Sequence, residues 1–247
     1  MSYSNVYFIL FKPQLSENIG ACARALKNFN FKNLRLVLPK INYPNEKVLA
    51  TSVGARNVIN SSKVFDNFED SIKDINCVIA TSSRLRKKNY KYLSISDLNK
   101  IDFNRRVGIV LGPEASGLAN NEMSYANYVI KLPTNKKFQS LNISHCVILL
   151  CYELFKILSK KNNKFKSIYK NKRISKKDLN NFVNFLIDSL DQIGFLQPQH
   201  KRKSMIENMR SIFHKMDLSN KEMRILLSIF ASLKNRKGSL TNTLLWL

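Results

Sequence analysis

Residues 107–118 read VGIVLGPEASGL, an apolar run that stops at a glycine–proline turn carrying a carboxylate. A short uninterrupted apolar run is typical of a strand buried on both faces of a parallel sheet. Ligands of such sheets bind at the carboxyl ends of the strands, so the turn after Leu111 is where a ligand is expected. The turn lacks GxGxxG, and Gly117 is followed by leucine instead of Lys-Ser/Thr. Nicotinamide-binding and ATP-binding loops are therefore disfavoured, and a tight turn with an exposed glutamate is the alternative.

The segments on either side of this stretch repeat the same alternation of strand and helix. Apolar runs predict strands at residues 6–10, 34–38, 77–81, 107–111 and 128–132. Helical spacing or capping residues predict helices at 18–29, 66–74 (capped by Asp66) and 141–158, with a short helix or turn at 48–54. Strands separated by helices indicate an α/β fold built on a parallel sheet with helices on both faces.

The composition changes at residue 159. Residues 159–177 contain nine Lys/Arg and no acid, which predicts a solvated linker or a direct RNA contact, and the two are compatible. Beyond it, helices are expected from Ser175 to Gly194, over 203–216, and from a Ser219/Glu222 capping box through residue 233. We therefore predict three parts: a domain at 1–160, a basic linker at 161–174, and a small all-helical domain at 175–247.

The charge of the chain favours a polyanionic partner. Lys and Arg number 41 against 17 Asp and Glu, a formal net charge of +24. Such a field attracts nucleic acid, although compositional drift of the genome could supply part of it and a membrane surface is the rival partner. Residues 160–247 hold 19 basic and 6 acidic residues, whereas 1–159 hold 22 and 11, so the charge density is greater in the shorter part. The helical part and its linker are therefore expected to bind RNA.

Cysteine and histidine spacing predicts no metal site. The four cysteines form no CxxC pair and the three histidines form no HExxH, so small buried thiols and structural or exposed histidines are expected. The sequence contains no apolar run of membrane-spanning length and no secretory signal. We therefore predict a cytoplasmic protein with reduced thiols that does not enter a membrane.

Three further clusters of small and polar residues could carry chemistry. Residues 18–24 read NIGACAR at a helix start, residues 138–144 read FQSLNIS before an apolar helix, and residues 81–83 read TSS after a strand. Taken singly, each fits ordinary capping and turn chemistry. Asn18 and Ser140 could be N-caps, and Arg24 could be a surface arginine of an amphipathic helix.

In order and spacing, NIGACAR, IVLGPEASGL and LPTNKKFQSLNIS resemble motifs 1, 2 and 3 of the TrmH-like branch of the SPOUT class of RNA 2′-O-ribose methyltransferases. The resemblance covers about residues 5–158. Within the branch, NIGACARALKNF and the tail segments LDQIGFLQPQHKRKSMIENMRSIF and MRILLSIFASL are most similar to the TrmJ type. That type methylates a pyrimidine, cytidine or uridine, in the tRNA anticodon loop.

The resemblance implies a parallel sheet with a C-terminal trefoil knot, a homodimer with its active site near the subunit interface, and S-adenosylmethionine as the cofactor. It implies 2′-O-methylation at tRNA position 32. Methylation of rRNA or of another tRNA site, and a catalytically inactive RNA-binding protein of the same fold, are the alternatives. The residues implied for the cofactor pocket are Thr81, Ser82, Ser83, Gly112, Leu132, Gln139, Ser140 and Leu141.

The resemblance assigns the motif 1 arginine, Arg24, to the ribose hydroxyl. A guanidinium stays protonated in proteins, which makes it a costly general base. We therefore expect Arg24 to clamp an RNA phosphate and orient the hydroxyl, a role that suits a bidentate cation. Asn18, Glu114 and Asn142 are expected to shape the site around it.

Overall fold

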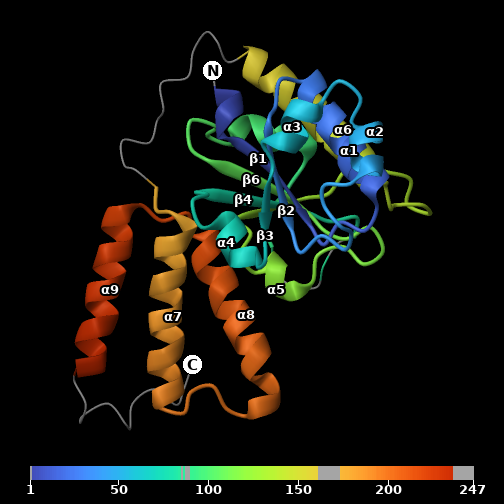
Figure 1. Ribbon diagram of the computed structural model, residues 1–247. Coiled ribbons are helices and arrows are strands. Elements are labelled where there is room, and N and C mark those ends of the chain that lie inside the picture. The colour runs from blue at the N-terminus through green and yellow to red at the C-terminus, as the bar shows by residue number, and fades with distance from the viewer. Residues whose placement is uncertain (1, 85, 87–89, 161–172, 236–247) are drawn as a thin grey trace.

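The computed structural model describes residues 2–84, 86, 90–160 and 173–235, which form a sheet domain above a bundle of helices (Figure 1). The seven described strands lie in one sheet in the order β3-β2-β1-β6-β4-β7-β5. Every neighbouring pair is parallel, as the sequence predicts. The strands are β1 (Val6–Phe11), β2 (Asn33–Val37), β3 (Lys63–Phe65), β4 (Cys77–Thr81), β5 (Tyr92–Leu93), β6 (Val107–Leu111) and β7 (Tyr128–Ile130).

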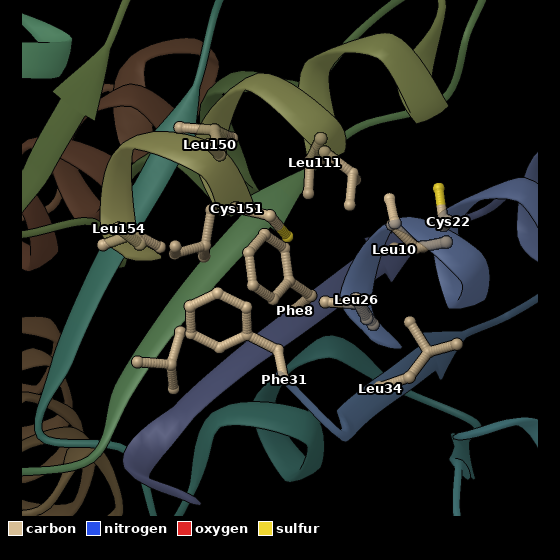
Figure 2. Close-up of a cluster of buried hydrophobic side chains, with 14 of the residues drawn as sticks. Phe8, Leu10, Cys22, Leu26, Phe31, Leu34, Leu111, Leu150, Cys151 and Leu154 are labelled. Atoms are coloured by element: carbon tan, nitrogen blue, oxygen red, sulfur yellow. The ribbon is translucent and has the colours of Figure 1, made fainter. Parts of the chain in front are cut away.

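The apolar runs are continuous because both faces of the sheet are covered. Along β1, Phe8 and Leu10 join one core cluster, whereas Ile9 and Phe11 join the cluster on the opposite face. This alternation follows from the two-residue period of a strand. Figure 2 shows Phe8 and Leu10 of the sheet packed among side chains of the covering helices.

Helices cover the two faces unequally. The first face is covered by α1 (Ser16–Asn28), α2 (Glu46–Thr51), α3 (Arg56–Asn60) and α6 (Ile143–Lys160). The second face is covered by α4 (Phe68–Ile72) and α5 (Asn120–Met123). Two short 3-10 helices complete the domain, η1 (Ser2–Asn5) and η2 (Ile95–Lys100).

Some predicted boundaries were wrong by a few residues. The helix expected from Asp66 is α4, and its cap is Asn67, whose side chain accepts from the Asp70 amide. The last predicted strand ends at Ile130 instead of residue 132. The apolar helix begins at Ile143, after Asn142 has accepted from the Ser144 amide at 2.8 Å. A local side-chain hydrogen bond fixes the start of each helix, and the strand ends three residues before Pro133.

The second domain is a bundle of α7 (Lys176–Gln192), α8 (Gln199–Lys215) and α9 (Asn220–Asn235) around its own apolar core. The predicted Ser175 cap, the left-handed Gly194 and the Ser219/Glu222 capping box are confirmed. Helix α8 begins at Gln199, four residues before the predicted start. Residues 161–172 of the predicted linker lie outside the described residues, and Ile174 at its end is buried in the bundle core.

The bundle packs against the amino ends of the sheet strands, close to β4 and β6. The amides of Lys176 and Lys177 donate to Ile75 O at 2.9 Å and Lys73 O at 3.1 Å. The Lys176 side chain is 1% exposed, and its Nζ lies 2.7 Å from His214 Nδ1. The basic run was expected to be solvated as far as residue 177, and at Lys176 that expectation was wrong because the bundle docks there.

Candidate active site

The carboxyl ends of β4, β6 and β7 surround a cavity of about 290 Å³. These three strands are neighbours in the sheet, so the loops that follow them meet although they are far apart in sequence. All eight residues that the resemblance implies for a cofactor pocket line this cavity: Thr81, Ser82, Ser83, Gly112, Leu132, Gln139, Ser140 and Leu141. The structure therefore brings the predicted pocket residues together in one place.

Two hydrogen bonds hold the end of β4 to its neighbours on either side. Thr81 Oγ1 donates to Val110 O of β6 at 3.0 Å, and the Ser82 amide donates to Ile130 O of β7 at 3.0 Å. The small polar residues after β4 thus fix the mouth of the cavity.

Gly112 allows the closest backbone approach in the cavity wall. A Cβ at this position would lie 2.3 Å from Leu118 N and 2.5 Å from Gly117 C. The turn between them closes through the Gly117 amide, which donates to Pro113 O at 2.8 Å, and Gly117 has a φ of +65°. Only glycine permits this folded-back turn, so Gly112 and Gly117 together shape the pocket wall.

Three of the four predicted catalytic residues form one hydrogen-bonded network. Asn18 Nδ2 donates to Glu114 Oε1 at 2.8 Å, and Asn142 Nδ2 donates to Asn18 Oδ1 at 2.9 Å. Glu114 Oε2 also accepts from the Gln14 amide at 3.2 Å. The network joins the start of α1, the turn after β6 and the start of α6.

Asn18 is not the N-cap that the sequence allows. Helix α1 begins at Ser16, so Asn18 lies inside its first turn, and its side chain is buried at 6% exposure. Its amide is consequently committed to Glu114 and Asn142 instead of the helix end.

Arg24 lies apart from this network. It is exposed and forms no ion pair with any described residue, and it is absent from the cavity lining. Six residues of helix separate it from Asn18, about 9 Å along the axis at 1.5 Å per residue. Within one chain, therefore, the structure joins Asn18, Glu114 and Asn142 but leaves Arg24 on the surface.

The sequence analysis missed two arginines that line the cavity, Arg84 and Arg86. Arg86 Nη2 donates to Leu118 O at 2.5 Å, which ties the loop after β4 to the turn after β6. Two arginines directly after a strand end were the available signal, because cations at that edge face whatever the sheet binds.

Across the described residues, no group of three or more His, Cys, Asp or Glu side chains is placed to hold a metal ion. Burial raises the pKa of the Cys146 thiol in the cavity wall to about 11, so this thiol is neutral near pH 7.

In the described part of the chain, no helix combines the length and apolar character needed to cross a membrane.

Comparison with known proteins identifies the family. Residues 5–152 match the SpoU rRNA Methylase family, which is more than half of the chain. The chain belongs to the SpoU methylase family. Residues 177–242 match a second family, the C-terminal domain of the tRNA methyltransferase TrmJ, and residues 236–242 of that match lie outside the described structure.

Individual members of the family match nearly the whole chain. The tRNA (cytidine-2′-O-)-methyltransferase TrmJ of Methanocaldococcus jannaschii is 32% identical over 230 residues, 90% of this chain and 96% of that protein. The tRNA (cytidine/uridine/adenosine-2′-O-)-methyltransferase TrmJ of Pseudomonas aeruginosa is 28% identical and covers 86% of this chain and 87% of its own length. The crystal structure of TrmJ from Z. mobilis ZM4 is 28% identical with a TM-score of 0.83, covering 92% of this chain and 98% of that one.

Proposed function

We propose that this protein transfers the methyl group of S-adenosylmethionine to a ribose 2′-hydroxyl of tRNA, at the pyrimidine of position 32 in the anticodon loop. The observation that carries the proposal is the convergence of three distant loops on one cavity beside the Asn18–Glu114–Asn142 network. The tRNA activities named for the TrmJ relatives support the substrate class.

The cavity suits S-adenosylmethionine in size and chemistry. Its volume of about 290 Å³ lies just below the usual range of small-molecule sites, about 300–1,000 Å³. Apolar side chains such as Leu118, Leu132 and Leu141 offer walls for an adenine, and the close approach at Gly112 leaves backbone groups facing the ligand. When bound, the cofactor supplies an electrophilic methyl group carried on a sulfonium sulfur.

The chain's own residues position the acceptor. Arg24 clamps a phosphate of the target nucleotide, which orients the ribose hydroxyl without requiring a neutral guanidinium. Asn18 holds Glu114 and Asn142 in fixed positions at the cavity edge, so the hydroxyl meets a preorganised polar surface. The hydroxyl proton leaves late in the transfer and passes to solvent water, as the bond from the ribose oxygen to the methyl carbon forms and the carbon–sulfur bond breaks.

In a homodimer, Arg24 of one subunit would lie at the cavity of the other subunit. The outer face of α6 exposes four apolar residues at one- to four-residue spacing, Ile148, Leu149, Tyr152 and Phe155, which are 39–52% exposed. The rings of Tyr152 and Phe155 also contact Phe29, next to the end of α1. A second copy covering this face would bury the stripe and place α1 beside the partner's cavity.

The trefoil knot that the resemblance implies is part of the proposed fold. Strand β7 lies between β4 and β5, both of which precede it in the chain. This insertion of a later strand between two earlier ones is compatible with a knot. A tRNA substrate also places the reaction in the cytoplasm.

Labelled methyl transfer tests the proposal. The protein is incubated with labelled S-adenosylmethionine and undermodified tRNA, and the labelled ribose is mapped. We expect label on the 2′-oxygen of position 32. Label on rRNA alone or at another tRNA site would assign a different substrate to the same reaction. No transfer to any RNA would indicate a catalytically inactive RNA-binding protein.

The clamp role of Arg24 has its own test. Arg24→Lys keeps the positive charge but loses the bidentate fork, so transfer should fall at least about tenfold. Near-full activity of Arg24→Lys would contradict the clamp.

A further inference from the structure

A second groove lies between α5 of the sheet domain and α8 of the bundle, with a volume of about 420 Å³. Its walls carry three cations of α8, Arg202, Lys203 and Arg210, against one carboxylate, Glu207. The groove therefore bears a positive charge on a protein whose net charge is already +24.

A larger groove, at the amino ends of the strands, has a different character. Its volume is about 1,110 Å³, and its five cations are balanced by four acids, Glu69, Asp70, Asp74 and Asp102. Mixed charge of this kind gives a polyanion little advantage. Of the two, the groove between α5 and α8 is the one whose charge favours a phosphate backbone.

The α5–α8 groove is joined to the candidate active site by one short segment. Leu118 lines the cavity, whereas Asn121, three residues later, lines the groove. Three extended residues span at most about 10 Å, which is about three base-pair rises of 3.4 Å. An RNA strand leaving the cavity therefore reaches the groove within a few nucleotides.

Arginines hold this segment from both sides. On the cavity side, Arg86 donates to Leu118 O at 2.5 Å. On the groove side, Arg210 Nη1 donates to Asn121 Oδ1 at 3.3 Å, and its guanidinium lies 5.1 Å from the Tyr125 ring centroid. One arginine thus lies at the cavity end of residues 118–121 and another at the groove end.

Among the three cations of the groove, Lys203 is the one that makes no hydrogen bond or ion pair with another described side chain. Arg202 is paired with Asp191 at 2.7 Å, and Arg210 is held by Asn121. Lys203 is exposed and forms no ion pair with any described residue. Its ammonium can therefore bind a phosphate without breaking an existing contact.

We propose that a tRNA strand crosses residues 117–121 and that its phosphates enter the α5–α8 groove of the same subunit, where Lys203 contacts them. The inference rests on the proposed function, because it takes the RNA held at the cavity as its starting point. It assigns to the bundle a defined contact surface on α8.

The test compares two charge reversals of equal size, Lys203→Glu and Lys221→Glu. Lys221 is also exposed without an ion pair to a described residue, but it lies on α9, on the far side of α7 from α8 (Figure 1). Both variants lower the net charge by two, so any difference between them reports location instead of overall charge. The affinity of undermodified full-length tRNA is measured from 50 to 200 mM salt, with S-adenosylmethionine affinity and melting temperature as controls.

We expect Lys203→Glu to weaken tRNA binding about tenfold at 100 mM salt and to lower the slope of log K against log salt by at least about one. Lys221→Glu should weaken binding by less than about threefold. With an isolated anticodon stem-loop, the ratio of wild-type affinity to Lys203→Glu affinity should equal the ratio found with full-length tRNA, because the groove adjoins the cavity. Loss of that ratio with the stem-loop would overturn the proposed path.

Equal weakening by the two reversals, or no weakening by either, would overturn the proposal. If the wild-type protein methylates tRNA while the two variants bind it alike, the groove assignment fails and the proposed function stands. If the wild-type protein neither binds nor methylates tRNA, both fail.

Discussion

The two edges of the sheet are built for opposite tasks. At the carboxyl edge, glycine, serine and threonine residues surround an open cavity, and its carboxylate, Glu114, is held by neutral amides. At the amino edge, charged side chains are paired within the protein: Arg105 binds Asp217 of the bundle at 2.7 Å, and Arg106 binds Asp74 of the sheet domain at 3.0 Å. One edge leaves backbone groups for a ligand, whereas the other uses its polar groups within the protein.

The largest effect should come from adding one methyl group at the carboxyl edge. In Gly112→Ala the new Cβ meets the backbone of residues 117 and 118 at 2.3–2.5 Å, so the cavity wall must move. We expect S-adenosylmethionine affinity to fall at least about 100-fold, roughly 2.7 kcal/mol, by isothermal titration calorimetry.

Gly108→Ala is the matched control on the same strand. Its Cβ would meet only side-chain atoms of Ile9 and Ile75, at 3.1–3.5 Å. Overpacking should cost about 1–3 kcal/mol in stability while cofactor affinity stays near that of wild type. If Gly112→Ala and Gly108→Ala lost equal S-adenosylmethionine affinity, the claim that Gly112 belongs to the cavity wall and Gly108 to the core would be contradicted.

The buried Lys176 at the amino edge should make the free energy of unfolding depend on pH. Burial lowers the pKa of Lys176 from 10.5 to about 7, and burial together with Lys176 lowers the pKa of His214. Between about pH 7 and 10.5 the unfolded chain binds more protons at Lys176 than the folded chain. The free energy of unfolding should therefore rise with pH, by roughly 1.4 kcal/mol per unit from this group.

Lys176→Met isolates that contribution. We expect its free energy of unfolding, from urea titrations at pH 7, 8 and 9, to rise less steeply than that of wild type. The neighbouring Lys177 is exposed, so Lys177→Met should keep the wild-type slope. Parallel curves for wild type and Lys176→Met would mean that this lysine keeps an ordinary proton affinity in the folded protein.

A smaller effect is expected from the network beside the cavity. Asn18→Ala leaves Glu114 and Asn142 without their shared partner, and because neither is buried, both can bind water and lose their fixed positions. We predict a kcat for methyl transfer about 10- to 100-fold lower, with cofactor affinity within threefold. Asn28→Ala, at the exposed end of the same helix, should retain wild-type kcat. Unchanged turnover in Asn18→Ala would remove the network from the chemistry.

The smallest effect should come from Cys146, a side chain in the cavity wall whose thiol donates only a long hydrogen bond, at 3.9 Å, to Leu141 O. Cys146→Ala should change cofactor affinity by less than about threefold, because the backbone defines the pocket. With a pKa of about 11, the wild-type thiol is roughly one part in a thousand thiolate at pH 8, so its alkylation should be slow. Rapid alkylation, or a large loss of affinity, would show that the thiol itself takes part.

The same contrast explains what the sequence could predict. The carboxyl edge depends on local patterns, since an apolar strand followed by small polar residues marks both the strand end and the ligand side. The strand at 107–111 was predictable for that reason, whereas the eight residues of the cavity were implied by the resemblance to the SPOUT motifs. Strands β3 and β5 are two or three residues long and carry no such pattern.

The amino edge depends on contacts between distant residues. Lys176 lies in a basic run that resembles a solvated linker, and only the docking of His214 from another helix makes it a buried residue. Asn18 could be taken for a helix cap because its partners, Glu114 and Asn142, lie 96 and 124 residues away. Such pairings are set by the tertiary fold.

Hydrogen exchange on adding S-adenosylhomocysteine tests most directly whether one edge of the sheet holds the ligand. We predict that three separate segments become protected, residues 81–84, 111–118 and 132–142, while the amides around Lys176 and along α8 exchange at their original rates. Protection confined to the bundle contact, or absent from any of the three segments, would contradict a single pocket formed at the carboxyl edge.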